Sequence, residues 1–143
     1  MQLLLKQEIL KELLNRQGLD YTGVLQPILS SPDAFSYRQR IRLQVDEMGR
    51  MGFYRMESHA LIEISTCLLA RTELNKVLKK LYNRKNTEVL LRLATEVELA
   101  CNSVAEGVVA TFTLRRKPRP ADLQSAKQIM KEIQELTHIF YCG

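Results

Sequence analysis

The chain has 143 residues, of which 45% are hydrophobic and 26% are charged, and its net charge is +5. This balance predicts a single folded domain over residues 1–143 and excludes a disordered chain, while the basic charge favours a polyanionic partner. Three cysteines without CxxC spacing argue against a disulfide-stapled secreted domain. No apolar run reaches the roughly 18 residues of a membrane helix, so we expect a cytoplasmic protein without a membrane partner.

The first predicted elements are a helix and an antiparallel meander. Leu5, Ile9 and Leu13 recur at helical spacing, and Gly18 is a suitable C-terminal cap. After an extended piece at 24–29, a strand ends at Val45. A turn at 46–49 then leads into strands at 50–56 and 60–65.

The second half is expected to alternate helices with strands. The segment from Thr87 to Leu93 fits either a helix or a strand, and that choice stays open. The other expected elements are a helix at 68–84, strands at 97–101 and 108–115 joined by a turn at 102–107, a helix from Ala121 to Leu136 opened by Pro120, and a strand at 138–142. This order indicates an α+β fold, in which helices pack on one face of an antiparallel sheet made of the meander and the later strands.

The stretch from Tyr37 to Val45 is the most informative part of the chain. Apolar side chains alternate there with basic or amide ones, so a strand would bury one set and expose the other. The apolar set is Tyr37, Ile41, Leu43 and Val45, and the other set is Arg38, Arg40, Arg42 and Gln44. The guanidiniums would lie about 7 Å apart, close to the phosphate repeat of an extended RNA strand. The alternative is a solvated strand face paired with glutamates across the sheet.

Three further positions could contact RNA. Phe53 and Arg55 could stack on and clamp an unstacked base, although an aromatic residue at strand spacing also fits a core position. His59 has no second histidine or carboxylate at metal-ligand spacing, which favours a surface position or an RNA contact over a metal ligand. The basic run at 115–119 fits a solvated loop or a further RNA contact.

A set of short motifs runs through residues 31–67: Ser31-Pro32, Tyr37-Arg38-Gln39-Arg40-Ile41-Arg42-Leu43, Met51-Gly52-Phe53-Tyr54-Arg55, Ser58-His59, Ile62, Ile64 and Cys67. In these motifs the chain resembles the central domain of the RNA uracil-5-methyltransferases. These enzymes use S-adenosylmethionine to form 5-methyluridine in 23S ribosomal RNA or transfer RNA. In the family this region follows a CxxxxxCxxC motif, and often a TRAM domain, and precedes a Rossmann-like methyltransferase domain. The resemblance implies that the chain is a central fragment of a longer enzyme.

The resemblance also implies how the functional residues are divided. RNA would dock on Arg38, Arg40, Arg42, Phe53, Arg55 and His59. Cys67 resembles the fourth ligand of the [4Fe–4S] cluster found in part of the family, which favours the 23S ribosomal RNA type over the transfer RNA type. No catalytic residue is assigned, because Cys142 lacks the Ser-Cys-Asn-Pro context of the family nucleophile. The fragment itself is expected to be inactive, to hold neither S-adenosylmethionine nor a cluster, and to bind RNA, not DNA.

Two other interpretations stay open at this point. The chain could be a self-sufficient basic α+β module that binds RNA or a protein without any attached enzyme. A purely structural oligomerisation domain is also conceivable, but it explains the arginine row least well.

Overall fold

The computed structural model describes residues 2–83, 85–102 and 107–143, and it divides into two compact units, Met1–Asp33 and Ala34–Gly143. The first unit contains helix α1 (Gln2–Arg16), which confirms the helix predicted from the leucine spacing. Gly18 follows it with a φ of 67°, the left-handed conformation expected of a C-terminal cap. No residue of α1 is buried, so the apolar side chains of this helix remain on the surface.

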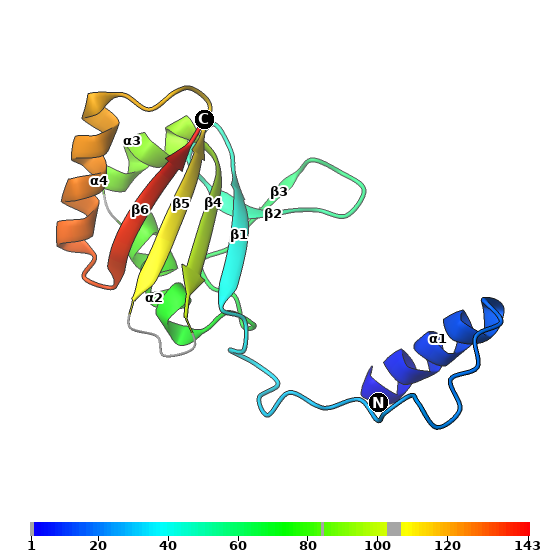
Figure 1. The fold of residues 1–143 in the computed structure, drawn as a ribbon. Helices are drawn as coiled ribbons and strands as arrows, with labels where there is room; N and C mark the ends of the chain where they lie inside the picture. The colour runs from blue at the N-terminus through cyan, green and yellow to red at the C-terminus, as the bar shows by residue number, and fades with distance from the viewer. Residues whose placement is uncertain (1, 84, 103–106) are drawn as a thin grey trace. The chain divides into compact units, whose positions relative to one another are not determined.

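The second unit is built on one mixed sheet, whose strand order within the described residues is β3-β2-β1-β4-β5-β6 (Figure 1). The strands are β1 (Arg40–Val45), β2 (Met51–Tyr54), β3 (Leu61–Glu63), β4 (Ala94–Cys101), β5 (Val108–Leu114) and β6 (Leu136–Cys142). Neighbouring strands are antiparallel except β5 and β6, which are parallel because helix α4 (Pro120–Glu132) carries the chain back between them. The predicted α+β class is confirmed, and the parallel pair at one edge is a departure from the all-antiparallel sheet.

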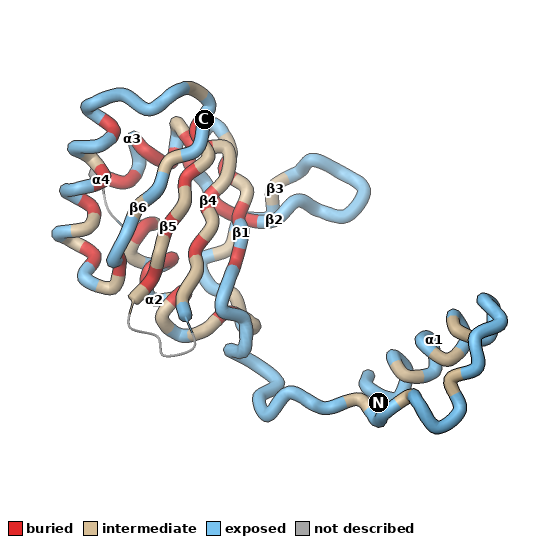
Figure 2. Tube along the Cα trace, viewed as in Figure 1, coloured by how far each residue is buried: buried red, intermediate tan, exposed pale blue. Residues whose placement is uncertain are grey.

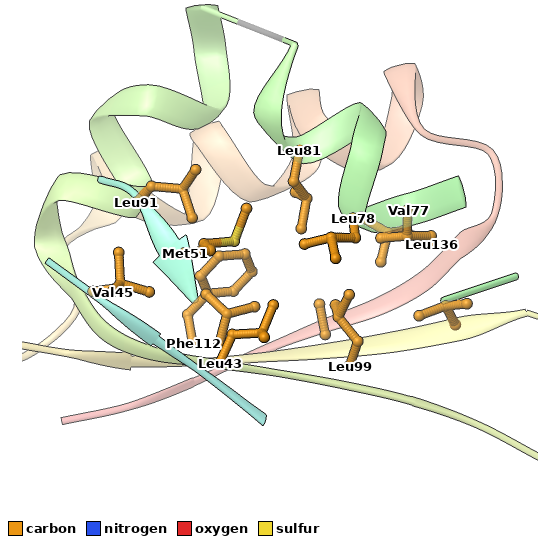
Figure 3. Packing of buried hydrophobic residues seen from close by; sticks show 14 of the residues in the cluster. Leu43, Val45, Met51, Val77, Leu78, Leu81, Leu91, Leu99, Phe112 and Leu136 are labelled. Carbon is orange, nitrogen blue, oxygen red and sulfur yellow. The ribbon is translucent and has the colours of Figure 1, made fainter. Parts of the chain in front are cut away.

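Helices α2 (Thr72–Tyr82), α3 (Lys85–Leu93) and α4 pack on one face of the sheet (Figures 1 and 3). Helix α2 begins four residues later than predicted. The side-chain amide of Asn75 bonds both backbone groups of Cys67, at 2.8 and 2.9 Å, which holds the preceding segment in a turn. The segment from Thr87 to Leu93, left open above, is helical. Among the described helices, none is both long and apolar enough to cross a bilayer.

The core lies between this helix layer and the sheet, where the buried residues cluster (Figures 2 and 3). Leu43 and Phe112 on the sheet are fully buried, as are Leu78 and Leu81 on α2. Burying each such side chain stabilises the fold by about 1.5–3 kcal/mol. Tyr37, predicted to join the buried set, is instead 46% exposed because it precedes β1; that part of the prediction is wrong.

Two glycines shape the hairpin of β1 and β2. Gly49 has a φ of 80° in the turn, which confirms the turn predicted at 46–49. Gly52 lies so close to the carbonyl oxygen of Ile62 that a β-carbon there would clash with backbone, and this close approach lets β2 pair with β3. The turn expected at 102–107 falls largely outside the described residues.

Candidate nucleic-acid interface

The sheet face opposite the helices carries the predicted arginine row. Arg40 and Arg42 point from β1 to this open face, while Ile41 and Leu43, which alternate with them, are buried. Strand β4 lies beside β1 with Arg42 directly opposite Glu98 and Gln44 directly opposite Glu96. The two strands therefore bring basic and acidic side chains together on the open face.

These side chains form a ladder of cross-strand ion pairs, which we call the Arg–Glu ladder: Arg40, Arg42, Gln44, Glu96 and Glu98. The Nε and Nη2 atoms of Arg42 donate to Oε2 of Glu98 at 3.2 and 3.0 Å. Arg42 Nε also lies 3.4 Å from Glu96 Oε1, and Arg40 Nε lies 3.5 Å from Glu98 Oε1. Gln44 donates to Glu96 at 3.3 Å. The charges of the ladder cancel, so its formal charge is zero.

The acidic and basic side chains of the ladder differ in how far they are exposed. The side chains of Glu98 and Glu96 are 18% and 25% exposed, whereas those of Arg40 and Arg42 are 69% and 60% exposed. The carboxylates thus lie lower and the guanidiniums lie closer to solvent. The hydrogen bond to Glu98 and the charges of both glutamates raise the pKa of Arg42 further above its ordinary value, so this residue is a permanent cation.

Arg38, the third arginine of the predicted row, lies outside β1. Its backbone N–H donates to the Leu69 carbonyl at 2.7 Å, and its carbonyl accepts from Arg71 N–H at 3.0 Å. These contacts form an isolated parallel bridge with Ala70. Arg38 is exposed, but the regular 7 Å spacing expected from a strand holds only for Arg40 and Arg42.

The β2–β3 hairpin carries the other predicted contacts. Phe53 is 38% exposed and pairs across the hairpin with Ile62, while Arg55 and His59 are exposed at its tip. The ring of His59 meets the ring of Tyr54 edge-on, with centroids 5.8 Å apart. The hairpin thus holds Phe53, Arg55 and His59 together on one projecting element.

A hollow of about 310 Å³ lies beside this hairpin. It is lined by Val45, Asp46, Glu47, Arg50, Tyr54, His59, Leu61 and Arg115. Arg115, which follows β5, donates to the carbonyl of Val45 at 3.2 Å and so ties the basic loop to the end of β1. Tyr54 and the glutamates of the ladder were not predicted as site residues. The glutamates meet Arg42 and Gln44 only through the pairing of β4 with β1, across more than 50 positions.

Cys67 is half-buried in the turn before α2. The other cysteines, Cys101 and Cys142, lie on β4 and β6. Across residues 2–83, 85–102 and 107–143, no group of three or more histidine, cysteine, aspartate or glutamate side chains is arranged to hold a metal ion. Because a [4Fe–4S] cluster commonly takes four thiolates, the described residues do not form a complete ligand set for one.

No protein-family model matches the chain, but individual relatives do. A 23S rRNA (uracil(1939)-C(5))-methyltransferase RlmD of Halomonas elongata is 29% identical over 119 residues, which cover 82% of this chain and 24% of the relative. The enzyme of the same name from Aliivibrio salmonicida is 30% identical over 88 residues, 59% of this chain and 20% of the relative. An RNA methyltransferase of Aquifex aeolicus is 32% identical over 77 residues, 54% of this chain and 18% of the relative.

The fold is similar to part of a solved structure. The Pyrococcus abyssi tRNA (uracil-54, C5)-methyltransferase in complex with S-adenosyl-L-homocysteine matches with a TM-score of 0.56 and 18% identity, over 78% of this chain and 29% of that one. The resemblance to the RNA uracil-5-methyltransferases is confirmed by these relatives. The chain spans about a quarter or less of the length of the curated relatives it matches.

Proposed function

We propose that the chain is the central, RNA-docking domain of a cytoplasmic S-adenosylmethionine-dependent RNA uracil-5-methyltransferase that acts on 23S ribosomal RNA. The observation that carries the proposal is the similarity to a 23S rRNA uracil-5-methyltransferase over 82% of this chain. Ribosomal RNA is preferred to transfer RNA because the two sequence relatives described above that are named by their substrate are 23S ribosomal RNA enzymes.

In this proposal RNA lies across the open face and the β2–β3 hairpin. The exposed guanidiniums of Arg38, Arg40 and Arg42 would contact phosphates, since guanidinium is well shaped for two-point contacts to phosphate oxygens. Phe53 and His59 would stack on unpaired bases, and Arg55 would clamp the backbone beside them. The helices cover the opposite face of the sheet (Figure 1), so the open face is the larger flat surface left for a nucleic acid.

The cofactors belong, in this proposal, to the longer enzyme. S-Adenosylmethionine supplies the methyl group there, and the catalytic nucleophile lies outside these residues. Cys67 would donate one thiolate to a [4Fe–4S] cluster whose other ligands come from elsewhere in the enzyme.

Replacing Arg38, Arg40 and Arg42 together with alanine tests the docking role. Binding of a fluorescein-labelled single-stranded RNA is measured by anisotropy over a range of salt concentrations. Loss of three phosphate contacts should reduce the slope of log affinity against log salt by roughly two units, at about 0.7 per contact for single strands. The matched control replaces Arg92, Lys127 and Lys131 with alanine, which removes the same charge from the helix layer. Equal losses in the two triple variants would contradict the assignment.

A further inference from the structure

The glutamates of the Arg–Glu ladder could either weaken or strengthen RNA binding by the arginines beside them. Negative charge beside a phosphate-binding arginine should weaken RNA binding by repulsion. Yet Glu98 lies directly opposite Arg42 across two paired strands and accepts two hydrogen bonds from its guanidinium. Arg40 approaches the other oxygen of the same carboxylate at 3.5 Å. One carboxylate therefore contacts both strand arginines.

The bonds to Glu98 use only one edge of the Arg42 guanidinium. They engage Nε and Nη2, whereas a guanidinium carries five planar N–H donors in a fixed fork. The donors on Nη1 lie outside these two bonds. Since the carboxylate is lower and the guanidinium is nearer solvent, a phosphate approaching the open face meets the guanidinium before it meets Glu98. The remaining edge keeps a geometry suited to two-point phosphate binding.

Holding the guanidinium in place before RNA binds lowers the conformational entropy that is lost on binding. An arginine free in solvent loses rotamer freedom when a phosphate immobilises it. Arg42 has already lost much of that freedom to Glu98. The opposing repulsion is weakened because the positive guanidinium lies between the carboxylate and the approaching phosphate. Orientation of Arg42 by Glu98 should strengthen RNA binding and repulsion by Glu98 should weaken it, so affinity measurements on variants can separate the two effects.

We propose that Glu98 is a positioning residue for RNA phosphate binding: it orients the guanidinium of Arg42 so that its outer edge faces the phosphate. This inference rests on the proposed RNA-docking function. Glu96 assists by contacting Nε of Arg42 at 3.4 Å and by accepting a hydrogen bond from Gln44. Because the glutamates cancel the formal charge of Arg40 and Arg42, the orientation of the guanidinium donors matters on this face in addition to charge attraction.

The test compares Glu98→Gln with Glu98→Ala in the full chain. Both variants remove the same negative charge, but only glutamine keeps an oxygen that can accept from Nε and Nη2 of Arg42. Anisotropy with a labelled single-stranded RNA should show that Glu98→Ala binds roughly three- to tenfold more weakly than Glu98→Gln, the cost of immobilising one arginine side chain. In the Arg42→Ala background the difference between the two variants should vanish.

Control variants separate positioning from folding and from charge. Glu88 pairs with Arg92 on α3 at 2.7 Å, away from the open face, so Glu88→Gln and Glu88→Ala should bind RNA equally. Thermal unfolding followed by circular dichroism confirms that each variant is folded, and Glu98→Gln, which keeps the side-chain volume, can still be compared with wild type if Glu98→Ala unfolds. In that case Glu98→Gln should bind no more weakly than wild type, while Arg42→Ala binds more weakly.

The outcomes distinguish this inference from the proposed function. If Arg42→Ala weakens RNA binding while Glu98→Gln and Glu98→Ala bind equally, Glu98 acts through charge alone and the positioning role is wrong. A difference between them that persists in the Arg42→Ala background also overturns it. If Arg42→Ala binds RNA as wild type does, the failure lies in the proposed docking surface itself.

Discussion

Strand β1 has two faces with opposite properties, although they differ by a single step along the chain. Ile41, Leu43 and Val45 are at most 4% exposed and pack under the helices. Arg40 and Arg42, which alternate with them, are more than half exposed on the other face. Successive side chains of a strand leave opposite sides of a sheet, so one six-residue strand serves both the core and the candidate interface.

This difference predicts that stability and the proposed RNA binding can be changed separately in this molecule. The buried face contributes apolar area removed from water, which is a large stabilising effect. The exposed face contributes ion pairs in solvent, which are typically worth little to stability. A substitution on one face should therefore change one property and leave the other nearly unchanged.

Leu43→Ala should have the largest effect on stability. Leu43 is fully buried beside Phe112 in the core, and its truncation should lower the free energy of unfolding by about 2–5 kcal/mol. Urea unfolding followed by circular dichroism measures this change. The neighbouring Arg42→Ala should leave the unfolding midpoint close to that of wild type. If the two variants destabilise the protein equally, the faces of β1 are not separable in the way described.

The faces of β1 could be predicted from sequence because the apolar and basic residues alternate from Arg40 to Val45. The same pattern misled at Tyr37 and Arg38, where the chain leaves the sheet. Their backbone is held instead by residues near Ala70, which are more than 30 positions away. Local periodicity carries no information on such a tertiary bridge.

From sequence, glutamate partners for the arginines could be predicted, but not which glutamates they are. Glutamates across the sheet were one interpretation of the exposed face, but the pairing of Arg42 with Glu98 spans 56 positions and depends on the β1–β4 register. The parallel edge pair follows from the order β5, α4 and β6, since parallel strands need a crossover connection. The candidate RNA contacts remain predictions, because residue type and exposure do not identify a ligand.

The ion pair of Asp122 differs from those of the ladder because its carboxylate is buried. Removing this carboxylate should change stability by an intermediate amount. The buried Asp122 accepts from Arg116 Nη1 and Nη2 at 2.7 and 2.9 Å and from Arg119 N–H at 2.7 Å. The hydrogen bonds from Arg116 and Arg119 hold the pKa of Asp122 below its ordinary value. The stabilisation is therefore complete above the unfolded-state pKa of about 4, and it is lost as the pH falls through the lower folded-state value.

Asp122→Asn should lower the unfolding midpoint at neutral pH by less than Leu43→Ala does. It should also flatten the dependence of stability on pH below about 4, because the titrating group is gone. Urea unfolding at several pH values measures both effects. Glu98→Gln is the control, since it removes a carboxylate from an exposed pair. An equally flattened profile in that variant would show that burial does not distinguish the two kinds of ion pair.

Exchanging the partners of the ladder should have the smallest effect on stability and a large effect on binding. Arg42→Glu alone places two carboxylates directly opposite each other, which is unfavourable on a sheet. Adding Glu98→Arg restores an opposite-charge pair across the same two strands, so the unfolding midpoint should return close to wild type. RNA affinity should not return, because the exposed partner on β1 is now a carboxylate. Recovery of both properties would mean that RNA senses only the total charge of this face, and the distinction between a lower carboxylate and an upper guanidinium would have no role in binding.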